Sequence, residues 1–163
     1  MRVSAGFTRF AAWPLPPGLW TSRRGLGSVG RVSTDLIRVV TEAMPLAANL
    51  GVRAHTVTAE QTVLSLDWRA ELCTGGGILH GGALMALADC AGAACAFAGL
   101  PAGARTSTIE SSTHFFAAVR AGTVTATARP LHSGRSTIVV QTELRDDSGK
   151  LVGLTTQTQA VLH

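Results

Sequence analysis

The sequence predicts an α+β domain in which an antiparallel sheet of five to six strands wraps around one long central helix. Two observations lead to this prediction. Residues 81–97 are apolar on every face of a helix, and the segments on both sides alternate apolar and polar residues as half-buried strands do. With 163 residues, 46% of them apolar, the chain is long enough for one domain with a real core.

The first 34 residues differ in composition from the rest. They contain five Arg and no acidic residue, together with the segment Trp-Pro-Leu-Pro-Pro-Gly at 13–18. We expect a flexible, basic, Pro- and Gly-containing extension over 1–34, either a leader such as a transit peptide or an over-extended start, and a folded domain over 35–163.

The domain carries nine Lys and Arg against ten Asp and Glu, a net charge of −1. A near-neutral body lacks the spread basic surface of nucleic-acid-binding proteins, so no nucleic-acid partner is expected.

The elements of the domain are predicted in chain order from periodicity and turn residues. A short helix over 35–44 is followed by a hairpin, with strands at 52–58 and 62–68 joined through Ala59-Glu60. After the long helix, a turn at 101–103 leads into four further strands. Because the links between these four are short, each strand is expected to pair with the next in antiparallel sense. They are predicted at 105–117, 123–131, 137–145 and 151–162.

Asp89 stands at the centre of the long apolar helix. Ala and Gly dominate this helix and strands flank it, so we interpret it as a core helix, and no membrane association is expected. A carboxylate in apolar surroundings costs free energy unless a partner compensates it. Asp89 is therefore either held by a structural partner or kept for catalysis.

A glycine-rich segment, 75–82, precedes the helix and ends in His80-Gly81-Gly82. The first turn of a helix has unpaired N–H groups and a partial positive charge, and glycine lets a ligand approach them, which suits a developing oxyanion. Gly81 and Asp89 are eight residues apart. This is about 12 Å along a helix, too far for both to act on one carbonyl. If they are catalytic, the spacing predicts a twofold homodimer with composite active sites.

The segment Leu79–Asp89, with its His-Gly-Gly-x6-Asp pattern, resembles the hotdog-fold acyl-CoA thioesterases. It is most similar to the phenylacetate-pathway (PaaI-like) branch of the 4-hydroxybenzoyl-CoA thioesterase superfamily. The resemblance covers about 45–162 and implies a hotdog fold, a long helix cradled in an antiparallel sheet, and a homodimer that often pairs into a tetramer. It is reinforced by Thr108, by Phe115–Gly122, by Leu131–Arg135 and by Gly149–Val152.

The resemblance also implies roles for single residues. The Gly81 N–H would polarise the thioester carbonyl, and Asp89 of the opposite subunit would act as general base or nucleophile. A hydroxyl residue after the helix would orient water, for which Thr108 is the best match and Ser107 its near neighbour. The family usually has Asn seven residues before the glycine. Here Thr74 holds that position, and its shorter hydroxyl is expected either to do a related job or to weaken activity.

Four more residues are candidates for substrate binding. His80, with Gly82 beside it, is expected to cap the helix or orient the loop rather than to serve as a base. Arg135, next to Gly134, is either a ligand of a CoA phosphate or a solvated surface charge.

The five His show no metal-ligand spacing. Three Cys without a CxxC pair indicate a reducing compartment, which favours the cytoplasm, with Cys90 as a packing residue.

The function predicted from these residues is hydrolysis of an acyl- or aryl-CoA thioester to the free acid and CoA. CoA enters as part of the substrate, and no metal or redox cofactor is expected. Two alternatives stay open. One is a non-catalytic acyl-CoA-binding protein of the same fold. The other, less favoured, is an enoyl-CoA hydratase, which would need an Asp and a His in one site.

Overall fold

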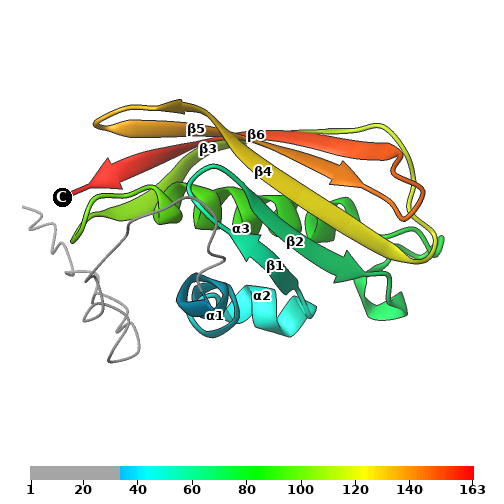
Figure 1. Cartoon of the computed structure of the whole chain (residues 1–163). Coiled ribbons are helices and arrows are strands. Elements are labelled where there is room, and N and C mark those ends of the chain that lie inside the picture. Colours follow the sequence, from blue (N-terminus) through cyan, green and yellow to red (C-terminus); the bar gives the residue numbers. More distant parts are fainter. Residues whose placement is uncertain (1–33) are drawn as a thin grey trace, which may run out of the picture.

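The computed structural model describes residues 34–163, so the predicted extension over 1–34 lies outside the described residues except for Thr34. A sheet forms one layer, the long helix α3 (Gly81–Ala98) packs beneath it, and two short helices lie further below (Figure 1). This is the predicted α+β arrangement, with six strands. The other elements are α1 (Thr34–Glu42), α2 (Pro45–Leu50), β1 (Arg53–Val57), β2 (Thr62–Asp67), the 3₁₀ turn η1 (Ala70–Leu72), β3 (Arg105–Phe115), β4 (Thr123–Ser133), β5 (Thr137–Arg145) and β6 (Leu151–Leu162).

All six strands belong to one antiparallel sheet, in the order β1-β2-β4-β5-β6-β3. The predicted pairings of β1 with β2, of β4 with β5 and of β5 with β6 are confirmed. The predicted pairing of β3 with β4 is wrong, because β3 lies along β6 instead. β3 ends at Phe115, earlier than expected, which leaves residues 116–122 as an extended connection rather than a tight turn. In this connection the N–H groups of Phe116 and Ala117 bond to the Val152 carbonyl over 2.9 and 3.3 Å.

The alternation of the strands places one face of the sheet on α3. Along β5 and the first half of β4 every second residue is buried, and the facing helix offers small side chains that allow a close approach. Ten of the 18 residues of α3 are buried. The helix is long and apolar enough to span a membrane by length and composition alone, but this burial is that of a core helix. One face is left open, where Met85 is 41% exposed and Asp89, one turn on, is half-buried.

Two short helices precede the sheet and lie below α3, beside β1 (Figure 1). α1 confirms the predicted helix over 35–44, although it ends at Glu42. The sequence analysis does not predict α2. This helix begins with Pro45 in its first turn and ends at Gly51, whose φ of +75° is left-handed and whose N–H bonds to the Ala47 and Ala48 carbonyls.

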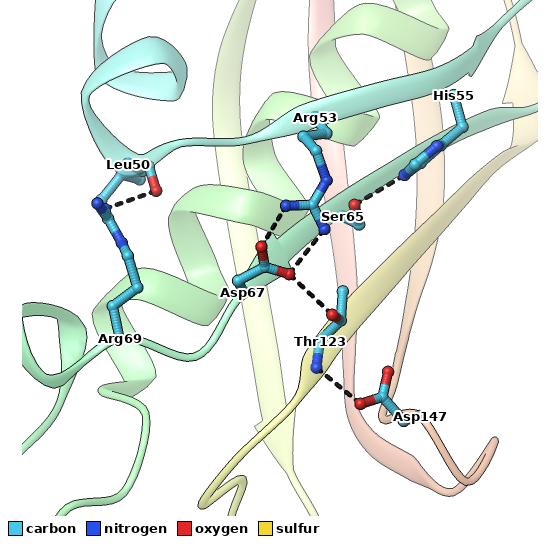
Figure 2. Close-up of polar contacts among 8 residues, drawn as sticks. All are labelled: Leu50, Arg53, His55, Ser65, Asp67, Arg69, Thr123 and Asp147. Carbon is cyan, nitrogen blue, oxygen red and sulfur yellow. Dashed lines mark hydrogen bonds and ion pairs between the residues drawn. The ribbon is translucent and has the colours of Figure 1, made fainter.

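A carboxylate bonded through both of its oxygens, Asp67, ties three neighbouring strands together (Figure 2). The Arg53 guanidinium on β1 forms an ion pair with both oxygens, with Nη2 2.7 Å from Oδ1. Thr123 on β4 donates its hydroxyl to the same Oδ1 over 2.8 Å. The Arg53 guanidinium holds the pKa of Asp67 well below its usual range. Asp147 accepts the Thr123 N–H over 3.0 Å, which extends the cluster to the β5–β6 turn.

Candidate active site

The first residue before α3, His80, caps the helix with its side chain. Its Nδ1 accepts the Gly82 N–H over 2.8 Å, which places the proton of the neutral ring on Nε2. The backbone N–H of His80 is held by the Leu72 carbonyl over 2.8 Å. By contrast, the Gly81 N–H has no acceptor among residues 34–163. It is therefore available at the positive end of the helix.

Close neighbours account for both glycines at the start of α3. A Cβ at Gly81 would lie 3.1 Å from the ring of Phe115, at the end of β3. A Cβ at Gly82 would lie 3.1 Å from Nδ1 of His80. Both contacts are tighter than ordinary packing, so a side chain at either position would displace a ring. The glycine pair thus serves packing as well as access to the helix N-terminus.

Thr74 lies in the tight loop that leads to α3. Its N–H bonds to the Ile78 carbonyl over 2.8 Å, and its carbonyl accepts the Gly77 N–H over 3.0 Å. Gly77 adopts a φ of +70°, which glycine accommodates without strain. The Thr74 side chain is exposed, and its hydroxyl has no hydrogen-bond partner within the described part of the chain. It is free to meet a ligand at this end of the helix.

Asp89 is bound through one of its two oxygens. Its Oδ1 accepts the Thr108 hydroxyl over 3.0 Å and the Gln157 amide over 3.2 Å. Its Oδ2 has no partner among residues 34–163. Of the two predicted hydroxyl residues, the structure thus places Thr108 against the carboxylate. Ser107 is exposed and, by strand alternation, lies on the opposite face of β3.

The structure does not bring Gly81 and Asp89 together within one chain. They remain on one helix, so the predicted separation of about 12 Å holds. Gly134 and Arg135 form the turn between β4 and β5, where β5 begins opposite the last residues of β6. Those residues pair with the start of β3, whereas the end of β3 lies next to Gly81. Gly134 and Arg135 are therefore at the other end of the sheet from the helix N-terminus.

A cleft of about 340 Å³ opens between α2, η1 and the first turns of α3. Sequence reasoning missed this cleft, because one of its walls is the unpredicted α2. It borders His80 and Gly82, the residues on either side of Gly81, whereas Gly81 itself is not among its lining residues. Its apolar lining comes from Leu46, Leu50, Leu72, Ala83 and Ala86.

The cysteines offer no nucleophile next to Asp89. Cys90 and Cys95 are buried, and burial raises the pKa of each thiol to about 11. Both are therefore neutral thiols near pH 7, and a neutral thiol is a poor nucleophile. The interpretation of Cys90 as a packing residue agrees with this environment.

Comparison with known proteins defines the family. Residues 76–153 match the model of the thioesterase superfamily. Over 118 residues the chain is 30% identical to the 1,4-dihydroxy-2-naphthoyl-CoA hydrolase of Listeria monocytogenes, an alignment that spans 72% of this chain and 96% of that protein. The chain belongs to the thioesterase superfamily. It is accordingly a thioester hydrolase with the hotdog fold, as the resemblance of its helix motif implies.

Two further relatives of this thioesterase delimit the similarity. An esterase-named protein of Vibrio cholerae is 40% identical over 85 residues, and the alignment spans 52% of this chain and only 57% of that protein. The solved structure of the Escherichia coli PaaI protein, from the phenylacetic acid degradation operon, superposes with a TM-score of 0.71 at 26% identity. That superposition covers 77% of this chain and 90% of PaaI.

Sequence reasoning missed two residues of the candidate site, Gln157 and Gln159 on β6. Both are fully buried. Gln159 donates its amide N–H to the Thr108 hydroxyl over 2.7 Å, and Gln157 bonds to Asp89 directly. The two glutamines are two residues apart and in phase with the buried Gly153 and Thr155, so both face the helix, but the sequence of β6 does not mark this phase as the inner one.

Proposed function

We propose that this thioesterase is an acyl-CoA thioesterase of the PaaI-like branch, which hydrolyses an acyl- or aryl-CoA to the free acid and CoA. One observation carries the proposal: α3 holds an unpaired N–H at its start and, at its centre, a carboxylate with one free oxygen. The first group suits the carbonyl oxygen of a thioester, and the second suits the attack on its carbon.

In the proposed reaction the thioester carbonyl accepts the Gly81 N–H, which stabilises the oxyanion that forms on attack. Asp89 either takes a proton from water, whose oxygen bonds to the carbonyl carbon, or attacks that carbon itself and is later released by water. In both routes the carbon–sulfur bond breaks and CoA leaves as a thiolate that takes up a proton. The net change consumes one water and yields one acid and one thiol.

The proposed assembly is a homodimer, with the option of a tetramer, in which each site combines Gly81 of one copy with Asp89 of the other. The separation of about 12 Å between Gly81 and Asp89 along one helix supports it. So does β3, an edge strand of 11 residues with mostly exposed side chains. Its exposed Ile109 and Phe115, together with Met85 on α3, are 62%, 50% and 41% exposed. A long unprotected edge with apolar neighbours is expected to be covered by a second chain.

Several further features belong to the same proposal. Thr74 contributes a hydroxyl at the oxyanion end, where relatives of this branch have an amide. Arg135, exposed at the β4–β5 turn, is a candidate ligand for a CoA phosphate. CoA enters as substrate, and the chemistry needs no metal or redox group because a thiolate leaves readily. The free Cys73, Cys90 and Cys95 fit a cytoplasmic, reducing environment.

The test is a thiol-release assay with short, medium, long and aryl CoA esters, run on the wild-type chain and on Asp89→Asn. We expect turnover of at least one ester by the wild type and its loss in the variant. Tight binding of acyl-CoA without turnover, unchanged in Asp89→Asn, would contradict the proposal and favour the binding protein. A change in absorbance with an enoyl-CoA and no thiol release would favour the hydratase.

A further inference from the structure

A fully buried amide of the sheet binds the carboxylate of Asp89. Gln157 points from β6 to α3, where its Nε2 donates to Asp89 Oδ1 over 3.2 Å and to the Asp89 backbone carbonyl over 3.4 Å. The opposite orientation of the amide would set its oxygen against these two oxygens. The observed donor role is thus the one that the surroundings of Gln157 impose.

The missing side chain of Gly92 leaves a gap on the surface of α3, here called the notch, into which this amide fits. A Cβ at Gly92, one turn after Asp89, would collide with the carboxamide of Gln157. The neighbouring positions of the helix are alanines, which stabilise a helix better than glycine does. Gly92 therefore costs helix stability, and what it provides is room for Gln157.

The amide is also retained at a cost to the core. Oε1 of Gln157 is buried and has no donor among the described residues. An unpaired buried acceptor is unfavourable, and an apolar side chain of the same shape would remove the penalty. Packing alone does not explain a glutamine at this position, whereas a need for its N–H donor does.

A second buried amide acts on the same oxygen through Thr108. Gln159 donates its Nε2 to the Thr108 hydroxyl oxygen over 2.7 Å, and its Oε1 accepts the Thr106 hydroxyl over 3.0 Å. Because the Thr108 oxygen accepts from Gln159, its proton is directed to Asp89 Oδ1 at 3.0 Å. The hydrogen bonds thus run in one direction, from Thr106 through Gln159 and Thr108 to Asp89.

We infer that Gln157 and Gln159 are positioning residues that hold the Asp89 carboxylate by Oδ1 and leave Oδ2 as the reacting oxygen. Both donors meet on Oδ1, so the carboxylate cannot rotate without breaking two hydrogen bonds. The free Oδ2 is then fixed in direction before substrate arrives, which is the condition for a productive attack. This inference rests on the proposed thioester hydrolysis, since it assigns a direction to the group that performs it.

The test compares Gln157→Met and Gln159→Met with a matched control, Gln141→Met. Gln141 lies on β5 between the inward-facing Val140 and Thr142, so its side chain is on the outer face of the sheet. With the best ester from the thiol-release screen, we expect the two inner variants to lose about 10- to 100-fold in kcat with KM changed by about twofold or less. The melting temperature of Gln157→Met should equal or exceed that of the wild type. The control should match the wild type in all three.

Unchanged kcat in both inner variants would overturn the inference. A fall in kcat that is accompanied by a clearly lower melting temperature in both inner variants would also overturn it, because a purely structural role predicts that pattern. If Gln157→Met does not fold, Gln159→Met decides by the same criteria, since it reaches Asp89 only through the Thr108 hydroxyl.

A second measurement separates this inference from the proposed function. Crystal structures of the two inner variants and of Gln141→Met show the direction of the Asp89 carboxylate. Loss of a donor to Oδ1 should turn the carboxylate or split it into two conformers in both inner variants and not in Gln141→Met. If the wild type hydrolyses no ester, the proposed function fails, and this change of conformation alone supports the positioning role. An unchanged carboxylate in all variants would refute it.

Discussion

Two carboxylates on this fold are bound in opposite ways. Asp67 is bonded through both oxygens, by a guanidinium and a hydroxyl, in the cluster of Figure 2. Asp89 is bonded through one oxygen only and by neutral donors, and no ion pair of residues 34–163 involves it. A saturated carboxylate with a counter-charge can tie strands together but has no oxygen left for chemistry. A half-bonded one without a counter-charge can accept a proton or attack a carbon.

The largest effect is expected from removing the charge of each of the two carboxylates in turn. Asp89→Asn removes the carboxylate that the proposed reaction uses to activate water or to attack, so turnover should fall by about 10²- to 10⁴-fold. Asp67→Asn, the matched change in the strand cluster, should leave turnover within about twofold. Thiol release under the same conditions measures both. Equal losses in the two variants would show that the charges matter only for folding.

Filling the notch at Gly92 should have the next largest effect, on both stability and turnover. Gly92→Ala drives a methyl group into the Gln157 amide, so we expect a loss of about 1–3 kcal/mol in the free energy of unfolding, together with reduced turnover. Gly99→Ala at the end of the same helix is the control, since its Cβ would lie 3.5 Å from the nearest atom, Ala59 Cβ. Urea denaturation measures the difference. A Gly92→Ala variant as stable as the control would mean that Gln157 moves away freely.

Cutting one of the two donors to Oδ1 should have a smaller effect. Thr108→Val keeps the shape of the side chain and removes a hydrogen bond to a charged group, for which we expect about a tenfold loss in kcat. Thr158→Val, on the outer face of β6, is the control and should be neutral. Turnover in Thr108→Val equal to the control would place the water-orienting role elsewhere.

The smallest effect concerns Asp67 and depends on pH. Because the ion pair with Arg53 lowers the pKa of Asp67 in the folded state, it stabilises the fold above the unfolded pKa of about 3.9, and this contribution is lost as the pH falls through the folded pKa. The urea midpoint of Asp67→Asn should be slightly below that of the wild type at pH 7, and the gap should narrow below about pH 4. A gap that is constant from pH 7 to pH 3 would contradict the assignment.

Much of the fold follows from the sequence because its signals are local. The strand periodicity, the hairpin through Ala59-Glu60 and the long helix each depend on neighbouring residues. The partner of β3 does not: whether Phe115 ends the strand depends on the packing of its ring against Gly81 and on the Val152 carbonyl that receives the chain. α2 was missed because six residues carry little periodicity, although Pro45 and Gly51 mark its two ends.

The residues of the candidate site, too, could be predicted from the sequence only in part. The motif from His80 to Asp89 predicts the two ends of the proposed chemistry from sequence alone. The choice between Ser107 and Thr108 needed the register of β3, which shifts between Thr108 and Glu110. Gln157 was missed because Thr and Gln alternate along β6, so polarity alone does not reveal which face is inside.

Because of the notch at Gly92, positions 92 and 157 are expected to change together in evolution. A side chain at 92 and a long side chain at 157 exclude one another, so a larger residue at 92 alone creates a collision and a shorter residue at 157 alone creates a void. Among descendants of a common ancestor, a chain that acquires Ala or Ser at 92 should carry a shorter residue at 157 and hold its acid by another donor. The residues at positions 92 and 157 would then distinguish one lineage of these hydrolases from related lineages.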